Sequence, residues 1–333
     1  MTTFEVRRVD PHDETLLRAW WEVGRDATAE RPVDAWPDWE ISRRALPMPR
    51  TDGTLVLVAA FEAEAPVGTG MVFLFRTDNT HLAEVDVFVA PPQRRRGIGR
   101  AILAELERIA RERGRTSLIT SVYAPVGSES PGSEFAAAVG YPVASAEETK
   151  TVDLTTAPAQ WGPLDELVAG ALGGYRVEVF EEHVPAEHVD GFCRLLEQFL
   201  GEVPTGDLDL EQARWTEERL REGEERAIAV GRVQVIAVAI APNGTLCGFS
   251  DLRINRSSPR HASVGGTLVL PAHRGHRLGL AMKLATHRRL VELFPECAYV
   301  ETGNAGVNAA MNAVNSQMGY RVVERCLDVQ KRL

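Results

Sequence analysis

Two short segments combine arginine and glycine at a spacing suited to binding a phosphate group. Residues 94–99 read RRRGIG and lie between an apolar run ending at Val89 and a helical pattern beginning near Gly99. Glycine lets the backbone turn tightly and approach a ligand closely. The loop N–H groups and the positive end of the following helix attract an anion, and arginine side chains bond phosphate oxygens in pairs. The pattern predicts a site for a phosphate or pyrophosphate.

The segment recurs in the second half of the chain. Residues 273–279 read HRGHRLG, and Gly279 follows Gly99 by 180 residues. VGY at 139–141 matches MGY at 318–320 with an offset of 179, and FEVRRVDPHDE from Phe4 resembles YRVEVFEEHVPAEH from Tyr175. Three landmarks in one order at nearly constant offset predict a duplicated domain.

The loop has two alternative interpretations. A dinucleotide-binding loop requires a parallel β-α-β unit that opens the domain and an acidic residue about 20 residues further on. Here the loop lies in mid-domain, after strands expected to be antiparallel, and its glycine spacing differs. A simple turn with solvated arginines is the remaining alternative, which the recurrence of the loop disfavours.

Hydrophobic periodicity predicts the elements that position these loops. In the first half we expect strands at 4–9, 54–60, 68–75, 84–89, 117–122 and 149–154, and helices at 13–26, 99–113 and 133–139. In the second half we expect strands at 176–180, 226–241, 246–254, 264–270, 298–302 and 321–329, and helices at 186–200, 210–223, 278–293 and 307–318. The pattern indicates an α/β fold of the mixed-sheet (α+β) kind. The predicted limits are a domain at 1–154, a linker at 155–174 with a short helix expected around 164–172, and a domain at 175–333.

Composition narrows the function. The 333 residues suit two domains, and no apolar run reaches the ~18 residues of a membrane span. The first residues lack the apolar core of a signal peptide, so we expect a cytoplasmic protein without membrane contact. The net charge of −10 argues against nucleic-acid binding and is compatible with a cationic amine as substrate. The four cysteines lie far apart, and neither they nor the histidines show metal-ligand spacing, so no metal is expected.

The motif R-x-x-G-x-G/A between a strand and a helix resembles the signature of the GNAT N-acetyltransferase superfamily. The resemblance implies two tandem domains, each a mostly antiparallel twisted sheet flanked by helices, that hold the pyrophosphate of acetyl-CoA at this loop. In the first half it assigns donor binding to Phe88, Val89, Arg94, Arg95, Arg96, Gly97, Ile98, Gly99 and Arg100. In the second half it assigns this role to Val269, Leu270, Arg274, Gly275, His276, Arg277, Leu278, Gly279 and Leu280.

The second loop departs from the motif because Arg277 replaces the first glycine. Its N–H could still bind the donor if φ stays negative. His273 and His276 are expected to pack in the loop or contact phosphate. The phrase HRGHRLGLAMK, from His273, resembles tandem GNAT proteins of high-GC bacteria, the group that includes mycothiol synthase.

A second family signature follows the next strand, where the resemblance implies an Asn that contacts the pantetheine arm and a Tyr that protonates the departing thiolate. Asn304 and Asn308 fit the polar contacts, although capping of the next helix would also explain them. Asn315 stands at the Tyr position in the second half and Ala136 in the first. Each half therefore departs from the family pattern in a different place.

The resemblance implies direct transfer of an acetyl group from CoA to the amine of a small molecule. The backbone N–H of Val89 or Leu270 would stabilise the thioester oxygen. The candidate bases are four carboxylates: Glu84 and Asp86 in the first half, and Asp251 and Glu301 in the second. Each is equally explained as a solvated or structural acid.

Three questions stay open at this stage. Tandem relatives favour the second half as the catalytic one, whereas the better loop lies in the first. The early tryptophans, Trp20, Trp21, Trp36 and Trp39, either line the acceptor site or belong to the core. A catalytically inactive acyl-CoA-binding or scaffold protein is the alternative function, and a monomer or homodimer is expected.

Overall fold

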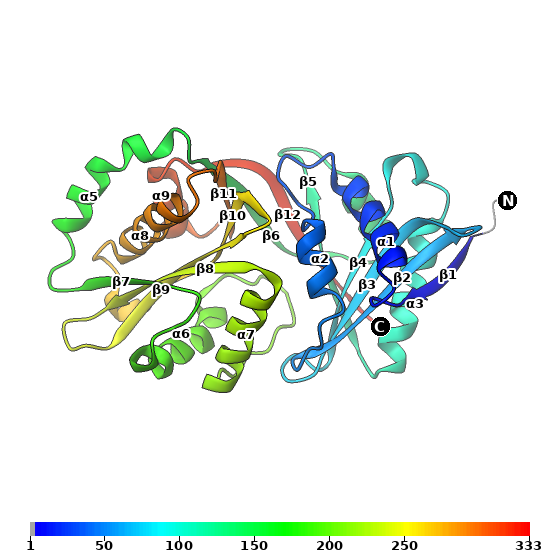
Figure 1. Ribbon diagram of the computed structural model, residues 1–333, viewed down its shortest axis with the longest axis horizontal. Helices are drawn as coiled ribbons and strands as arrows, with labels where there is room; N and C mark the ends of the chain where they lie inside the picture. The colour runs from blue at the N-terminus through cyan, green and yellow to red at the C-terminus, as the bar shows by residue number, and fades with distance from the viewer. Residues whose placement is uncertain (1–3) are drawn as a thin grey trace. The chain divides into compact units, whose positions relative to one another are not determined.

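The computed structural model describes residues 4–333, which form two compact units (Figure 1). Unit 1 takes the chain up to Ala146 together with Gly206–Glu211 and Cys326–Leu333. Unit 2 takes Glu147–Thr205 and Gln212–Arg325. No helix within residues 4–333 combines the length and apolar character that crossing a bilayer demands.

Unit 1 is a sheet with helices on both faces. Its elements are β1 (Glu5–Val9), α1 (Glu14–Thr28), α2 (Trp39–Ala45), β2 (Gly53–Glu62), β3 (Ala65–Phe75), β4 (Leu82–Phe88), α3 (Ile98–Glu112), β5 (Ser117–Ala124) and α4 (Pro131–Ala138). Strands β1 to β5 are neighbours in sequence order, antiparallel except for the parallel pair β4–β5. One core cluster lies under α1 and α2, and a second lies under α3 and α4.

Unit 2 repeats this plan. Its elements are β7 (Arg176–Glu181), α6 (Val189–Glu202), α7 (Glu217–Val230), β8 (Arg232–Ile240), β9 (Leu246–Asn255), β10 (Ser258–Val269), α8 (Leu278–Leu293), β11 (Tyr299–Ala305) and α9 (Ala309–Gln317). Its strand order is β6-β11-β10-β9-β8-β7, with β10–β11 as the parallel pair. Helices α6 and α7 cover one face, and α8 and α9 cover the other.

Two strands carry the chain from one unit into the other. β6 (Val143–Asp153) pairs with β11 from Glu147 onward, within unit 2. β12 (Arg321–Arg332) starts in unit 2, but its residues from Cys326 belong to unit 1. There, Lys331 Nζ donates to Glu107 Oε1 at 2.7 Å. Each unit is therefore completed by a strand that belongs to the other half of the sequence.

The mixed α/β fold predicted for both halves is confirmed. The segment 155–174 holds the 3-10 helix η2 (Ala157–Gln160) and α5 (Gly162–Ala169), and Trp161 is buried in the core of unit 2. The domain limits 1–154 and 175–333 stay a prediction. The two compact units differ from them in that each unit includes segments from both halves of the sequence.

Several predicted boundaries were wrong. The helix expected at 210–223 runs instead from Glu217 to Val230, because the Thr216 side chain caps it and Gly231, with φ of 85°, ends it. The strand expected from residue 226 consequently begins at Arg232. The short helix α2 was not predicted; the Asp38 side chain caps it by accepting from Ile41 N.

Candidate functional site

Each unit contains one pair of parallel strands that separates before the strands end. In unit 1, β4 and β5 are paired only from Leu82 with Ser117 to Glu84 with Ile119. In unit 2, β10 and β11 are paired only from His261 with Tyr299 to Ser263 with Glu301. Beyond these points the two strands diverge, which leaves backbone groups at a strand edge where an extended ligand can hydrogen-bond.

The first arginine of each loop bonds the end of the strand before it. Arg94 Nε donates to Val89 O, and Arg274 Nε donates to Val269 O, both at 3.1 Å. In an extended strand, the N–H and C=O of one residue point to the same side. The Leu270 N–H faces the other way, since it donates to Cys247 O of β9 at 2.9 Å.

This contact corrects one assignment. Leu270 was expected to supply the N–H that stabilises the thioester oxygen, but its N–H is already used within the sheet. The N–H of Val269 points toward the divergence instead. Val89, 180 residues earlier, has the same arginine contact and is the corresponding group in unit 1.

The two loops share one backbone conformation despite their different sequences. Arg95 and Gly97 have positive φ values of 65° and 89° in unit 1, and Gly275 and Arg277 have values of 90° and 53° in unit 2. Glycine thus occupies one of the two left-handed positions in each loop, but not the same one. The condition set for donor binding by the Arg277 N–H, a negative φ, is not met. The shape of the phosphate-type loop is nevertheless retained, at a cost of roughly 1–2 kcal/mol for each non-glycine residue.

Most of the loop side chains predicted to contact the donor are held by the protein itself. Arg94 and Arg274 form ion pairs with Glu30 at 3.0 Å and Glu202 at 2.6 Å, respectively. Arg96 pairs with Glu62 at 3.0 Å. A phosphate bound at either loop would therefore depend mostly on backbone N–H groups. Arg95, whose side chain is 87% exposed, is the arginine of the first loop best placed to add a charge.

Other predicted loop residues have structural roles. The apolar side chains of the helix starts are buried in the core; these are Ile98, Leu278 and Leu280. His273 Nδ1 lies 3.0 Å from Tyr175 Oη, and the His276 ring lies 4.6 Å from the Tyr175 ring. Both histidines thus pack in the loop, as one of the two sequence-based interpretations proposed.

The first pair of candidate acids occupies matched positions where the strands diverge. In unit 1, the last parallel pair is Glu84 on β4 with Ile119 on β5. In unit 2, it is Ser263 on β10 with Glu301 on β11. The acid is therefore present in both units but is carried by opposite strands.

The second pair of candidate acids also occupies matched positions on different strands of the two units. Asp86 on β4 is paired with Met71 on β3, whereas Gly266 on β10 is paired with Asp251 on β9. A Cβ added at the adjacent Gly265 would lie 2.1 Å from Asp251 Oδ2, so glycine leaves room for the carboxylate. All four predicted acids thus mark equivalent places in the two units.

Asp86 differs from the other acids in its environment. Burial and, secondarily, the charge of Glu84 raise the pKa of Asp86 to about 7, opposed by a hydrogen bond from Thr120 Oγ1 at 3.3 Å. Burial also raises the pKa of Glu84. Asp251 accepts hydrogen bonds from Gln234 at 3.1 Å and Arg253 at 3.2 Å, which engage its carboxylate. Asp86 is therefore the acid best placed to exchange a proton near neutral pH.

The asparagines of unit 2 form a buried network. Asn308 caps α9 by accepting from Met311 N at 3.2 Å, as the capping interpretation predicted. Asn304 Oδ1 accepts from Asn315 Nδ2 at 2.9 Å and from Lys150 Nζ at 3.0 Å. Asn315 is fully buried, and its Oδ1 has no hydrogen-bond partner within residues 4–333. Asn304 and Asn315 are thus brought together next to the β10–β11 divergence.

Sequence reasoning missed the lysine in this region. Lys283 on α8 is fully buried, and within the described part of the chain its Nζ has no hydrogen-bond partner. Burial and then the charge of Lys150 lower the pKa of Lys283 to about 7. The sequence held one indication that this lysine is unusual: lysine is rare, and only Lys150, Lys283 and Lys331 occur in the chain.

His287 lies one helical turn further along α8. Its Nδ1 is 2.6 Å from Lys283 O, and its Nε2 is 2.7 Å from Tyr320 Oη. A carbonyl only accepts, so Nδ1 carries the proton and the Tyr320 hydroxyl donates to Nε2. Burial and the charge of Lys283 lower the pKa of His287 to about 3, which keeps this histidine neutral.

Two units with one plan, each with a divergent parallel strand pair followed by an arginine-glycine loop and a helix, define a tandem GNAT-type protein. Residues 14–127, about a third of the chain, match the Acetyltransferase (GNAT) family. Within residues 4–333, no group of three or more His, Cys, Asp or Glu side chains is placed to hold a metal ion. The predicted likeness to the mycothiol synthase group stays a prediction.

Solved structures match the whole chain. A tandem GNAT protein from the clavulanic acid biosynthesis pathway, solved without acetyl-CoA, is 26% identical with a TM-score of 0.83, covering 99% of this chain and 98% of that one. A GCN5-related N-acetyltransferase from Sphaerobacter thermophilus is 16% identical with a TM-score of 0.65 (99% and 95% covered). N-myristoyltransferase from Saccharomyces cerevisiae, with bound myristoyl-CoA, is 10% identical with a TM-score of 0.60 (100% and 80% covered). No curated protein sequence matches the chain.

Proposed function

We propose that the protein transfers an acetyl group from acetyl-CoA to the amine of a small molecule, and that the transfer takes place in unit 1. The match of residues 14–127 to the GNAT family supports acyl transfer in general. The observation that carries the finer proposal is the half-buried Asp86 carboxyl, whose pKa is raised to about 7, just beyond the last β4–β5 residue pair.

Val89, Arg94 and Asp86 of unit 1 each have a defined role in this reaction. The bound donor supplies an acyl thioester, and the N–H of Val89, oriented by Arg94, is aimed at its oxygen. The Asp86 carboxylate removes a proton from the acceptor ammonium, which makes the amine nucleophilic. The new C–N bond forms as the C–S bond breaks, the nitrogen releases its second proton to solvent, and the thiolate leaves. Ala136 stands where the family has its acid, so solvent must protonate the thiolate.

The surroundings of Asp86 favour an amine with an apolar body. Phe88, two residues further along β4, lies 4.7 Å from the Trp36 ring. Glu84 adds a second carboxylate beside Asp86, and two acids attract a cation. Trp20 and Trp21 are buried in the core, in keeping with the core interpretation of these tryptophans, whereas Trp36 contacts Phe88 of the same strand face as Asp86.

The experiment is acetyl transfer from acetyl-CoA to a panel of small amines, read as release of free thiol. Asp86→Asn should lower kcat by about 100-fold or more, because general-base catalysis contributes this much. Asp251→Asn, at the corresponding place in unit 2, is the matched control and should leave the rate unchanged. A large loss of rate in Asp251→Asn together with an unchanged rate in Asp86→Asn would place the chemistry in unit 2.

Thr120→Val tests the same proton transfer through its pH dependence. Loss of the Thr120 hydrogen bond removes an effect that lowers the pKa of Asp86. The reaction needs the carboxylate, so activity rises with pH through about 7 in the unaltered protein, and the midpoint should move to higher pH in the variant. A profile that does not move would exclude Asp86 as the base.

An acyl-CoA-binding protein without turnover is the second candidate, because Ala136 and Asn315 replace the acid of the family. Calorimetric titration with acetyl-CoA, using Gly99→Trp and Gly279→Trp variants, measures how many loops bind the donor. Donor binding without turnover of any amine would favour this second function. A cytoplasmic location and a monomeric or homodimeric state also stay proposals.

A further inference from the structure

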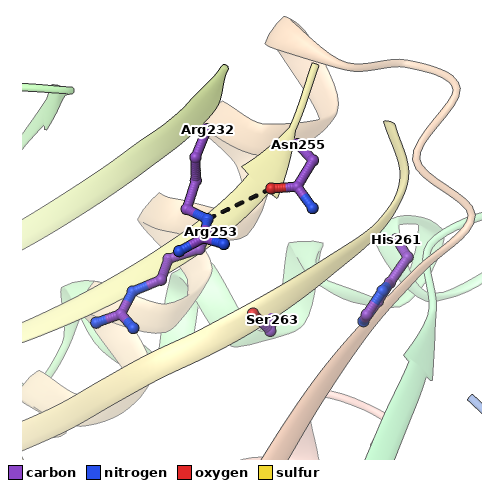
Figure 2. A pocket seen from close by; sticks show the side chains of 5 residues that line it. All are labelled: Arg232, Arg253, Asn255, His261 and Ser263. Carbon is purple, nitrogen blue, oxygen red and sulfur yellow. Dashed lines mark hydrogen bonds between the residues drawn. The ribbon is translucent and has the colours of Figure 1, made fainter. Parts of the chain in front are cut away.

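A polar pocket of about 180 Å³ lies on unit 2, lined by Arg232, Arg253, Asn255, His261 and Ser263 (Figure 2). Three neighbouring strands, β8, β9 and β10, contribute these side chains. The pocket is on the sheet face that α6 and α7 partly cover, the same face from which Asp251 projects. It is thus separate from the arginine-glycine loop at the other end of β10.

Two guanidinium groups, of Arg232 and Arg253, give this pocket a positive charge. Within residues 4–333, the hydrogen bond from Arg232 goes to Asn255 Oδ1 at 3.4 Å, a neutral acceptor (Figure 2). Burial, followed by the charges of Arg253 and Arg226, lowers the pKa of Arg232. Arg253 uses its Nε to bond Asp251 Oδ2 at 3.2 Å, and its side chain is 47% exposed. Two like charges side by side, one of them largely buried, favour the arrival of an anion.

In unit 1, the positions that match Arg253 and Asn255 carry apolar side chains. Arg253 and Asn255 correspond, 180 residues earlier, to Phe73 and Phe75, whose rings pack against each other at 5.0 Å. The same face therefore changed from aromatic in one copy to cationic in the other.

The pocket borders the divergence of unit 2. Ser263 belongs to the last residue pair before β10 and β11 separate, and its partner is Glu301. His261 Nε2 lies 3.5 Å from Glu301 Oε2. A molecule anchored in the pocket can therefore extend toward Glu301 and Asp251, the acids at the divergence.

We propose that unit 2 binds a small molecule through an oxyanion, a carboxylate or a phosphate group, held between Arg232 and Arg253. Arginine suits both groups because its planar fork matches two oxygens at once. Asn255 and Ser263 supply further hydrogen bonds to the same group. The site goes beyond the transfer proposed for unit 1 and does not depend on it.

The test is calorimetric titration of the full chain with glutarate, inorganic phosphate and the neutral amide glutaramide. We expect glutarate or phosphate to bind and glutaramide not to bind. Arg253→Met should weaken anion binding at least tenfold. Arg260→Met removes an exposed arginine of β10 outside the pocket and is the matched control, which should bind as the unaltered chain does.

Equal anion binding by the Arg253→Met and unaltered chains, or no binding of either anion to the unaltered chain at millimolar concentration, would overturn the proposal. Circular dichroism of each variant establishes that it is folded. Asp86→Asn should abolish amine acetylation while leaving anion binding intact. This difference separates a failure of the oxyanion site from a failure of the proposed transfer.

Discussion

Replacing Lys283 by leucine should stabilise unit 2, and the gain should depend on pH. Leucine is the residue found 180 positions earlier, as Leu103, in the core of unit 1. The side chain of Lys283 is fully buried, and burial lowers its pKa from 10.5 to about 7. The substitution removes an ionisable group from a place where its charged form is disfavoured.

The size of the effect follows from the two pKa values. Between pH 7 and 10.5 the unfolded chain keeps a proton that the folded chain has lost, so stability rises with pH in this window. At 1.36 kcal/mol per pH unit, burying the ammonium costs roughly 5 kcal/mol at pH 6 and ~2 kcal/mol at pH 9. The advantage of the leucine variant should therefore shrink by about 2–3 kcal/mol between these pH values.

The assay is urea unfolding at pH 6 and pH 9, with hydrogen exchange of the α8 amides as the signal for unit 2. Lys331→Leu is the control, because Lys331 pairs with Glu107 at 2.7 Å and its loss should destabilise the fold. A stability difference between the Lys283→Leu and unaltered chains that is the same at both pH values would refute the reasoning. It would mean that Lys283 stays protonated in the folded chain.

Two further substitutions test the loop and the buried network. Arg277→Gly should stabilise the chain by about 1 kcal/mol, because Arg277 has a φ of 53° that glycine adopts without strain; thermal unfolding measures this, and a lower melting temperature would contradict it. Tyr320→Phe should cost about 1–3 kcal/mol, because His287 Nε2 loses its buried donor. Urea unfolding measures the loss of stability in Tyr320→Phe, which should be much larger than the loss in a control variant at an exposed position, Val322→Ala.

The candidate site was partly predictable from the sequence. Arg94, Gly97 and their repeat were found because a phosphate-type loop places its residues close together in the chain. Glu84 and Asp86 were proposed as candidate bases because they alternate on one strand, and their role stays a prediction. That Asp251 and Glu301 occupy equivalent places was not predictable, because cross-strand register depends on pairing partners distant in sequence.

The backbone and the interior were harder to predict. A left-handed φ at Arg277 contradicts the usual preference of non-glycine residues, and only the retained loop shape reveals it. Lys283 lies at a core position of α8, where a lysine would ordinarily be assigned to the surface. The asparagine network likewise depends on residues from β6, β11 and α9 that local patterns do not bring together.

The exchanged ends of β6 and β12 have a consequence for how the protein is made. The ribosome synthesises residues up to Ala146 before unit 2, but the strand segment that completes their unit, Cys326–Leu333, follows unit 2 in the chain. The first unit therefore waits for this segment with one sheet edge unpaired, although most of its residues appear early. Unit 2 holds all of its own segments once Arg325 has emerged. The order in which the two units mature is thus the reverse of the order in which their sequences begin.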